Sequence, residues 1–127
     1  MELKKAYYAR PISVDNTPQA ERDINLIRAM GFEPYPVGED KQKALAEYAR
    51  LKENSLDPME AFDKYVRECD AVFFRAFPDG SIGAGVMREL TTAALYTIPV
   101  VEIPRQLQRR GLSVEDTREM LMELGQR

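Results

Sequence analysis

Histidine is absent from this chain of 127 residues, and cysteine occurs once, as Cys69. Without histidine there is no Ser–His or Cys–His pair for nucleophilic catalysis and no histidine ligand for zinc. A single cysteine excludes an internal disulfide, and Cys69 lies beside Asp70 with nothing to activate it, so we interpret it as a core or semi-buried thiol. An acid, base or nucleophile must therefore come from Asp, Glu, Tyr, Lys or this thiol, and carboxylates are the leading candidates.

Long apolar runs are also missing. No segment reaches the roughly 18 apolar residues that a membrane-spanning helix needs, and Met1–Lys5 lacks the apolar core of a secretory signal. We therefore expect a cytoplasmic protein with no membrane partner. With 44% apolar and 31% charged side chains, residues 1–127 suit one compact domain.

A strongly basic balance is the third feature that the chain lacks. The formal net charge is −3, and lysine and arginine are dispersed along the sequence. Binding to a long nucleic acid needs a basic stripe that neutralises phosphates, so we expect no such partner. A small anionic ligand is still compatible with this composition.

Short apolar segments alternate with helical patterns along the chain. The expected helices cover residues 18–30, 41–52, 58–69 and 84–96, with a last helix capped by Ser113. The expected strands cover residues 6–9, 32–36, 71–76 and 98–103. This alternation predicts an α/β fold: a single doubly wound domain of the flavodoxin or Rossmann type, whose mainly parallel sheet is flanked by helices.

Several segments carry more specific expectations. Phe32–Pro36 contains two prolines and is predicted to be an edge strand, whereas Ile98–Ile103 is predicted to be buried. The charged helix over residues 41–52 has no strong apolar stripe, so we interpret it as a surface helix or mobile flap. Arg75, in an apolar run, needs a carboxylate or anion, and we interpret it as an edge-facing or interface arginine.

The richest motif runs from Asp79 to Glu89, because it joins an apolar run to a helix through a glycine-rich turn. Gly80, Gly83 and Gly85 allow close approach of a ligand and positive φ, and their amides, with Ser81, could hold a sugar hydroxyl or a 5′-phosphate. Ligands of parallel sheets gather at the carboxyl ends of the strands. Three segments are therefore expected to face one crevice: residues 7–11, 77–85 and 103–105.

The order of these motifs resembles the nucleoside 2-deoxyribosyltransferase superfamily, which includes deoxynucleoside monophosphate N-glycosidases. The resemblance rests on Tyr7–Pro11, the strand start Asp70–Val72, the glycine turn with Glu89, and Pro99–Val101. It implies that Glu89 attacks the anomeric carbon of a deoxyribose.

The chain departs from the family pattern at one position of the turn. Gly85 and Glu89 match the end of the pattern, but Gly83 stands where the family has Asp or Ser. Either Ser81 or Asp79 supplies the missing polar group, or the contact with the sugar hydroxyl has been lost.

A retaining transfer also needs a proton donor for the departing base, and paired carboxyl groups about 5 Å apart are the usual geometry. The resemblance places this second carboxylate closest to Asp63, and Asp79 is the alternative. Near a helix start, Glu89 is expected to stay ionised unless burial dominates, whereas an apolar environment would raise the pKa of Asp63.

The first strand contributes further candidates. Tyr7 either packs in the core or orients the nucleophile. Arg10, next to Pro11, either holds a phosphate or pairs with Asp15 or Glu21.

These features predict an enzyme that cleaves or exchanges the N-glycosidic bond of 2′-deoxynucleosides, with catalytic residues Glu89, Asp63, Asp79 and Tyr7 and with neither metal nor organic cofactor. The alternatives are a deoxynucleoside 5′-monophosphate hydrolase and a non-catalytic nucleotide sensor. A homo-oligomer, dimeric or higher, is also expected, because Met120, Leu121 and Leu124 on the last helix could cover a partner.

Overall fold

Four parallel strands form the centre of the protein, in the order β2-β1-β3-β4. The computed structural model describes residues 4–105 and 110–126. The strands are β1 (Lys4–Ala9), β2 (Phe32–Tyr35), β3 (Ala71–Phe74) and β4 (Val100–Glu102). The predicted α/β doubly wound fold is thereby confirmed, and the strand order changes direction between β1 and β3, where such folds place their ligands.

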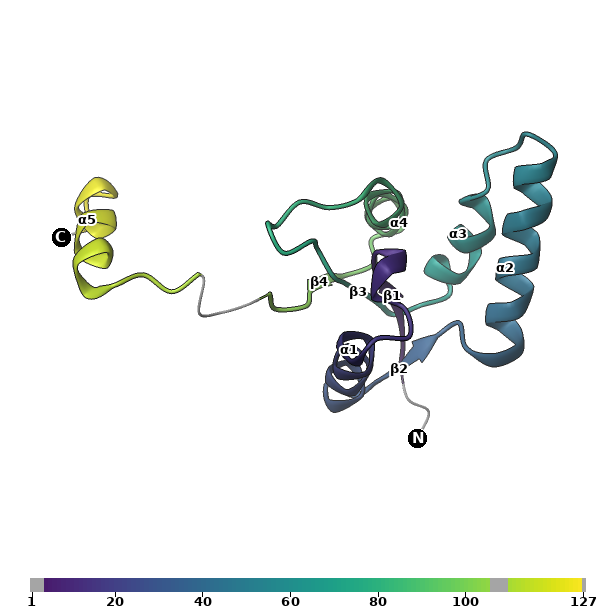
Figure 1. Ribbon diagram of the computed structural model, residues 1–127, viewed down its shortest axis with the longest axis horizontal. Coiled ribbons are helices and arrows are strands. Elements are labelled where there is room, and N and C mark those ends of the chain that lie inside the picture. Colours follow the sequence, from purple (N-terminus) through teal and green to yellow (C-terminus); the bar gives the residue numbers. More distant parts are fainter. Residues whose placement is uncertain (1–3, 106–109, 127) are drawn as a thin grey trace.

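Helices cover both faces of this sheet (Figure 1). The short η1 (Ile12–Val14) follows β1, and the last helix, α5 (Val114–Glu123), stands apart from the sheet. One face carries α1 (Pro18–Ala29), and the opposite layer is built from α2 (Gly38–Glu53), α3 (Glu60–Arg67) and α4 (Ala84–Leu95).

Side chains alternate between the two faces of each strand, so the protein has two hydrophobic cores, one on each face of the sheet. Tyr7 packs with Val66 of α3 and Leu90 of α4 on one face. Tyr8 packs with Ile27 of α1 on the other face. Adjacent tyrosines of β1 therefore serve different layers of the protein.

The local signals for the helix ends are confirmed. Thr17 caps α1 by accepting a hydrogen bond from the amide of Ala20, and Ser113 caps α5 in the same way through Asp116. Gly31, which follows α1, has a φ of +91°. Only α3 begins later than expected, at Glu60.

Two strand predictions had different outcomes. Phe32–Tyr35 is an edge strand, as its prolines indicated. The expectation that residues 98–103 form a buried strand was wrong, because β4 covers only Val100–Glu102 and Val100 is 41% exposed. Since β4 lies at the other edge and pairs only with β3, its β-branched residues do not lie between two strands.

None of the ten residues of α5 is buried. Its apolar side chains include Met120 and Leu124, which are exposed, and Leu121, which is partly exposed. The homo-oligomer that these residues suggested stays a prediction. In the described ranges, every helix is too short or too polar to cross a lipid bilayer.

Candidate functional site

A cavity of about 320 Å³ opens at the carboxyl end of β1. Its size falls in the range of small-molecule sites, about 300–1,000 Å³. The first strand, the start of α4 and the inner sides of α2 and α3 enclose it. The lining residues are Tyr7, Tyr8, Arg10, Pro11, Asp15, Pro36, Lys41, Leu45, Tyr48, Met59, Phe62, Gly83, Gly85, Val86 and Glu89.

Glu89 lies in the wall of this cavity and is only 6% exposed. Its helix, α4, packs on the sheet through Val86, Leu90 and Ala93, so position 89 beside this stripe also faces inward. Burial raises the pKa of Glu89 to about 7, although hydrogen bonding with Tyr7 and the charge of Arg10 act in the opposite direction.

Burial therefore dominates at Glu89, which is the condition under which the sequence analysis allowed its pKa to rise. Glu89 is six residues beyond the cap residue Gly83, and the stabilising effect of a helix start on an anion fades within the first turn. Desolvation is the largest cause of the shift. With a pKa of about 7, the carboxyl group changes protonation state near neutral pH.

Tyr7 lies beside this carboxylate in the cavity wall and lowers its pKa. It is almost fully buried on β1, and burial, followed by the nearby Glu89, raises the pKa of its phenol well above the usual value. The phenol therefore stays protonated at neutral pH. The structure thus brings Tyr7 and Glu89 together, as the hypothesis of an oriented nucleophile required.

Arg10 and Pro11 also line the cavity, at the end of β1. The Arg10 guanidinium is held by Asp15, with Nε 2.7 Å from Oδ1, and it donates through Nη1 to the Tyr8 carbonyl at 2.8 Å. One of the two pairings considered from the sequence, with Asp15 rather than Glu21, is therefore present. The position of Arg10 keeps a fixed cation near Glu89, whose pKa it lowers.

The glycine-rich turn divides into two parts. Gly83 and Gly85 line the cavity, but Gly83 has an ordinary φ of −64°, so the expected positive φ holds only for Gly80, at +92°. Gly80 lies outside the cavity, and a side chain there would meet Arg105 Nη1 at 2.0 Å. No side chain caps the N-terminus of α4 at Gly83, so the turn presents backbone amides to the cavity.

The predicted proton donors lie elsewhere. Asp79 accepts hydrogen bonds from the amide and hydroxyl of Ser81, which lower its pKa, and neither residue lines the cavity. Asp63 accepts from Arg88 Nη2 at 2.9 Å and from Thr92 Oγ1 at 3.0 Å, in a separate depression. The charge of Asp63 reaches the site only by raising the pKa of Glu89.

The third segment of the expected crevice is also absent from the cavity wall. Ile103 is buried in the core on the α1 face, and Arg105 packs over Gly80. Because β4 lies two strands away from β1, its carboxyl end is too remote to join the site.

The sequence prediction missed the wall formed by α2. Lys41, Leu45 and Tyr48 line the cavity, and their spacing of four and three residues puts them on one face of the helix. This spacing is visible in the sequence, but the many charges between these residues weaken it. The interpretation of α2 as a surface helix or flap is therefore incomplete, since one of its faces closes the site.

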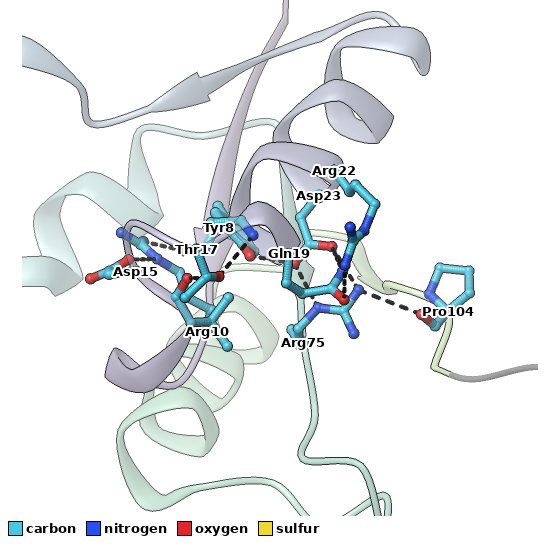
Figure 2. Close-up of polar contacts among 11 residues, drawn as sticks. Tyr8, Arg10, Asp15, Thr17, Gln19, Arg22, Asp23, Arg75 and Pro104 are labelled. Atoms are coloured by element: carbon cyan, nitrogen blue, oxygen red, sulfur yellow. Dashed lines mark hydrogen bonds and ion pairs between the residues drawn. The ribbon is translucent and has the colours of Figure 1, made fainter.

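A second buried carboxylate lies on the opposite face of the sheet. Asp23 of α1 is 1% exposed and accepts two hydrogen bonds of 2.6 Å from Arg75, as well as one from the Tyr8 hydroxyl (Figure 2). Arg75 thus has the carboxylate that the sequence analysis required, but inside the protein. The interpretation as an edge-facing or interface arginine was wrong, because Asp23 lies on the side of α1 that faces the sheet.

No group of three or more acidic or cysteine side chains suitable for a metal ion occurs in the described part of the chain. No match to this protein was found among models of protein families, curated proteins or solved structures. The function is therefore argued from the cavity itself and from the motifs in the sequence.

Proposed function

We propose that this protein cleaves or exchanges the N-glycosidic bond of 2′-deoxynucleosides or their 5′-monophosphates through a covalent glutamyl-deoxyribose. The observation that carries the proposal is Glu89, a buried carboxylate in the wall of a cavity of ligand size that it shares with the protonated Tyr7. Burial of an acid without a cation in direct contact opposes folding, and such sites are commonly functional.

In the first step, ionised Glu89 attacks C1′ of the sugar, the C1′–N bond breaks, and its electron pair leaves with the base. In the second step, another base or water attacks C1′ and displaces the carboxylate. Two displacements retain the configuration at C1′, as in retaining glycosidases. Tyr7, which lines the cavity with Glu89 and lowers its pKa, orients the attacking oxygen.

The monophosphate hydrolase is the second candidate, and the N-terminus of α4 favours it. Gly83, Gly85 and Val86 line the cavity at a helix start that has no side-chain cap. Backbone amides at such a position suit a phosphate group. This arrangement supports a substrate that carries a 5′-phosphate next to the deoxyribose.

A substrate panel tests the proposal. The purified protein is incubated with deoxyinosine plus adenine, and separately with deoxynucleoside 5′-monophosphates, while free base and new nucleoside are measured by chromatography. Base exchange supports the transferase, and base release from monophosphates alone supports the hydrolase. Thermal stabilisation by nucleotides without bond cleavage would instead support a sensor.

A further inference from the structure

The α2 wall of the cavity, formed by Lys41, Leu45 and Tyr48, has no role in the proposed function so far. These residues share one face of the helix. Leu45 is 45% exposed, which is unusual for a leucine on the inner side of a helix. An exposed apolar side chain inside a cavity of ligand size is available to cover a ligand.

Aromatic side chains give this wall the character of a stacking surface. Tyr48 of α2 and Phe62 of α3 both line the cavity, with ring centroids 5.7 Å apart and planes tilted by 49°. The remaining apolar contacts come from Leu45 and Met59. Flat heterocycles stack on such surfaces in nucleic-acid-binding proteins.

Lys41 is the one cationic residue of this wall. Among the described residues, no carboxylate oxygen lies within 4.0 Å of its ammonium group, whereas the other cation of the cavity, Arg10, is held by Asp15. An ammonium group offers three hydrogen-bond donors and no acceptor. It therefore selects ligand groups that carry lone pairs or negative charge.

We infer that the α2 wall is the nucleobase subsite, and that Lys41 donates a hydrogen bond to an exocyclic oxygen of the base. This inference rests on the proposed function and deepens it. The base stacks on Tyr48 and Phe62, the sugar lies between this wall and Glu89, and the ammonium group of Lys41 reaches the oxygen-bearing edge. An oxo base such as hypoxanthine is preferred over an amino base such as adenine.

The same contact assists departure of the base. As the C1′–O bond to Glu89 forms and the C1′–N bond breaks, negative charge spreads over the ring to the exocyclic oxygen. A hydrogen bond from the Lys41 ammonium stabilises this charge, and the departing base takes its proton from water. Neither Asp63 nor Asp79 lines the cavity. In this assignment the Lys41 cation, instead of a carboxylic acid, stabilises the departing base.

The test compares Lys41→Met with the unsubstituted protein on deoxyinosine and deoxyadenosine 5′-monophosphates, which differ at the exocyclic group of the purine. We expect kcat/KM for the hypoxanthine substrate to fall about 10–100-fold, and that for the adenine substrate to fall less than about threefold, because only the former loses a charge-assisted hydrogen bond. Lys41→Arg restores part of the preference. Lys43→Met, on the exposed side of α2, is the matched control and leaves both substrates unchanged.

Equal losses on both substrates would overturn the inference. A change confined to the ratio between nucleosides and their monophosphates would also overturn it, because Lys41 would then serve the phosphate. To separate the two proposals, the affinities for free hypoxanthine and adenine are measured by calorimetry in the unsubstituted and Lys41→Met proteins. If the unsubstituted protein cleaves no substrate, the proposed function fails, while a hypoxanthine preference that Lys41→Met removes still supports the base subsite.

Discussion

Each face of the central sheet buries a carboxylate next to a tyrosine of β1, but the pKa of the two carboxylates shifts in opposite directions. On the α1 face, Asp23 accepts hydrogen bonds from the Tyr8 hydroxyl and from Nε and Nη2 of Arg75, which hold its pKa below the ordinary value despite burial. On the α4 face, no ion pair joins Glu89 to an arginine or lysine among the described residues, and burial raises its pKa to about 7.

The difference separates an acid that is paired within the protein from the acid that we propose as the nucleophile. The Asp23 oxygens are fully used by protein donors, so this carboxylate links α1 to the end of β3 and offers nothing to a ligand. The carboxylate of Glu89 lines a cavity, where its oxygens are available to a ligand. A buried acid whose hydrogen bonds are incomplete opposes folding, so its presence at a cavity favours a function there.

The largest expected effect comes from removing the reactive acid. Glu89→Gln should lower turnover of the best panel substrate at least about a thousandfold, because the amide cannot form the sugar ester. Release of free base, followed by chromatography, is the measurement. Glu119→Gln, on an exposed position of α5, is the matched control. Turnover within tenfold of the unsubstituted protein would reject Glu89 as the nucleophile.

Removing the structural acid should affect folding. We expect Asp23→Asn to lower the free energy of unfolding by about 3–5 kcal/mol, because the mostly buried Arg75 loses its counter-charge. Urea denaturation at pH 7 measures the change. Asp15→Asn breaks the more exposed pair with Arg10 and should cost less than about 1 kcal/mol. Equal losses in the two variants would contradict the distinction between the pairs.

The two faces should also differ in how they respond to pH. Because the pKa of Glu89 rises from 4.5 to about 7 on folding, the native state holds its proton more tightly, and this stabilisation is lost as the pH rises from about 4.5 to 7. Glu89→Gln should therefore be more stable than the unsubstituted protein by about 2–3 kcal/mol at pH 8 and nearly equal to it at pH 4.5. Urea denaturation at both values is the test, and a difference that does not vary with pH would refute it.

The smallest expected effect concerns the tyrosines. In the unsubstituted protein, kcat/KM should rise with pH and level off above about 7, since only ionised Glu89 attacks the sugar. Tyr7→Phe removes the phenol that lowers the pKa of Glu89 and should move the midpoint upward by about one pH unit. Tyr8→Phe, whose partner is Asp23, should leave the midpoint in place. Coinciding midpoints in all three proteins would exclude Tyr7 as the group that positions Glu89.

Several helix ends and the class of the fold could be read from local patterns. Thr17 with Pro18, Gly31 and Ser113 mark helix ends because capping and positive φ depend on neighbouring residues only. The glycine turn and the carboxylate that follows it also lie in one short segment, so the sequence alone pointed to Glu89 as a candidate site residue. In contrast, the exposure of β4 depends on its place at the edge of the sheet.

The sequence by itself determined the α/β alternation, the two tyrosines on opposite faces of β1 and the choice of a carboxylate as the proposed nucleophile, because periodicity and composition act locally. Only the tertiary structure decided that Glu89 is buried, that Arg75 meets Asp23, and that α2 closes the cavity while Asp63 stays outside it. These outcomes depend on desolvation and on contacts between residues far apart in the chain, which no local pattern encodes.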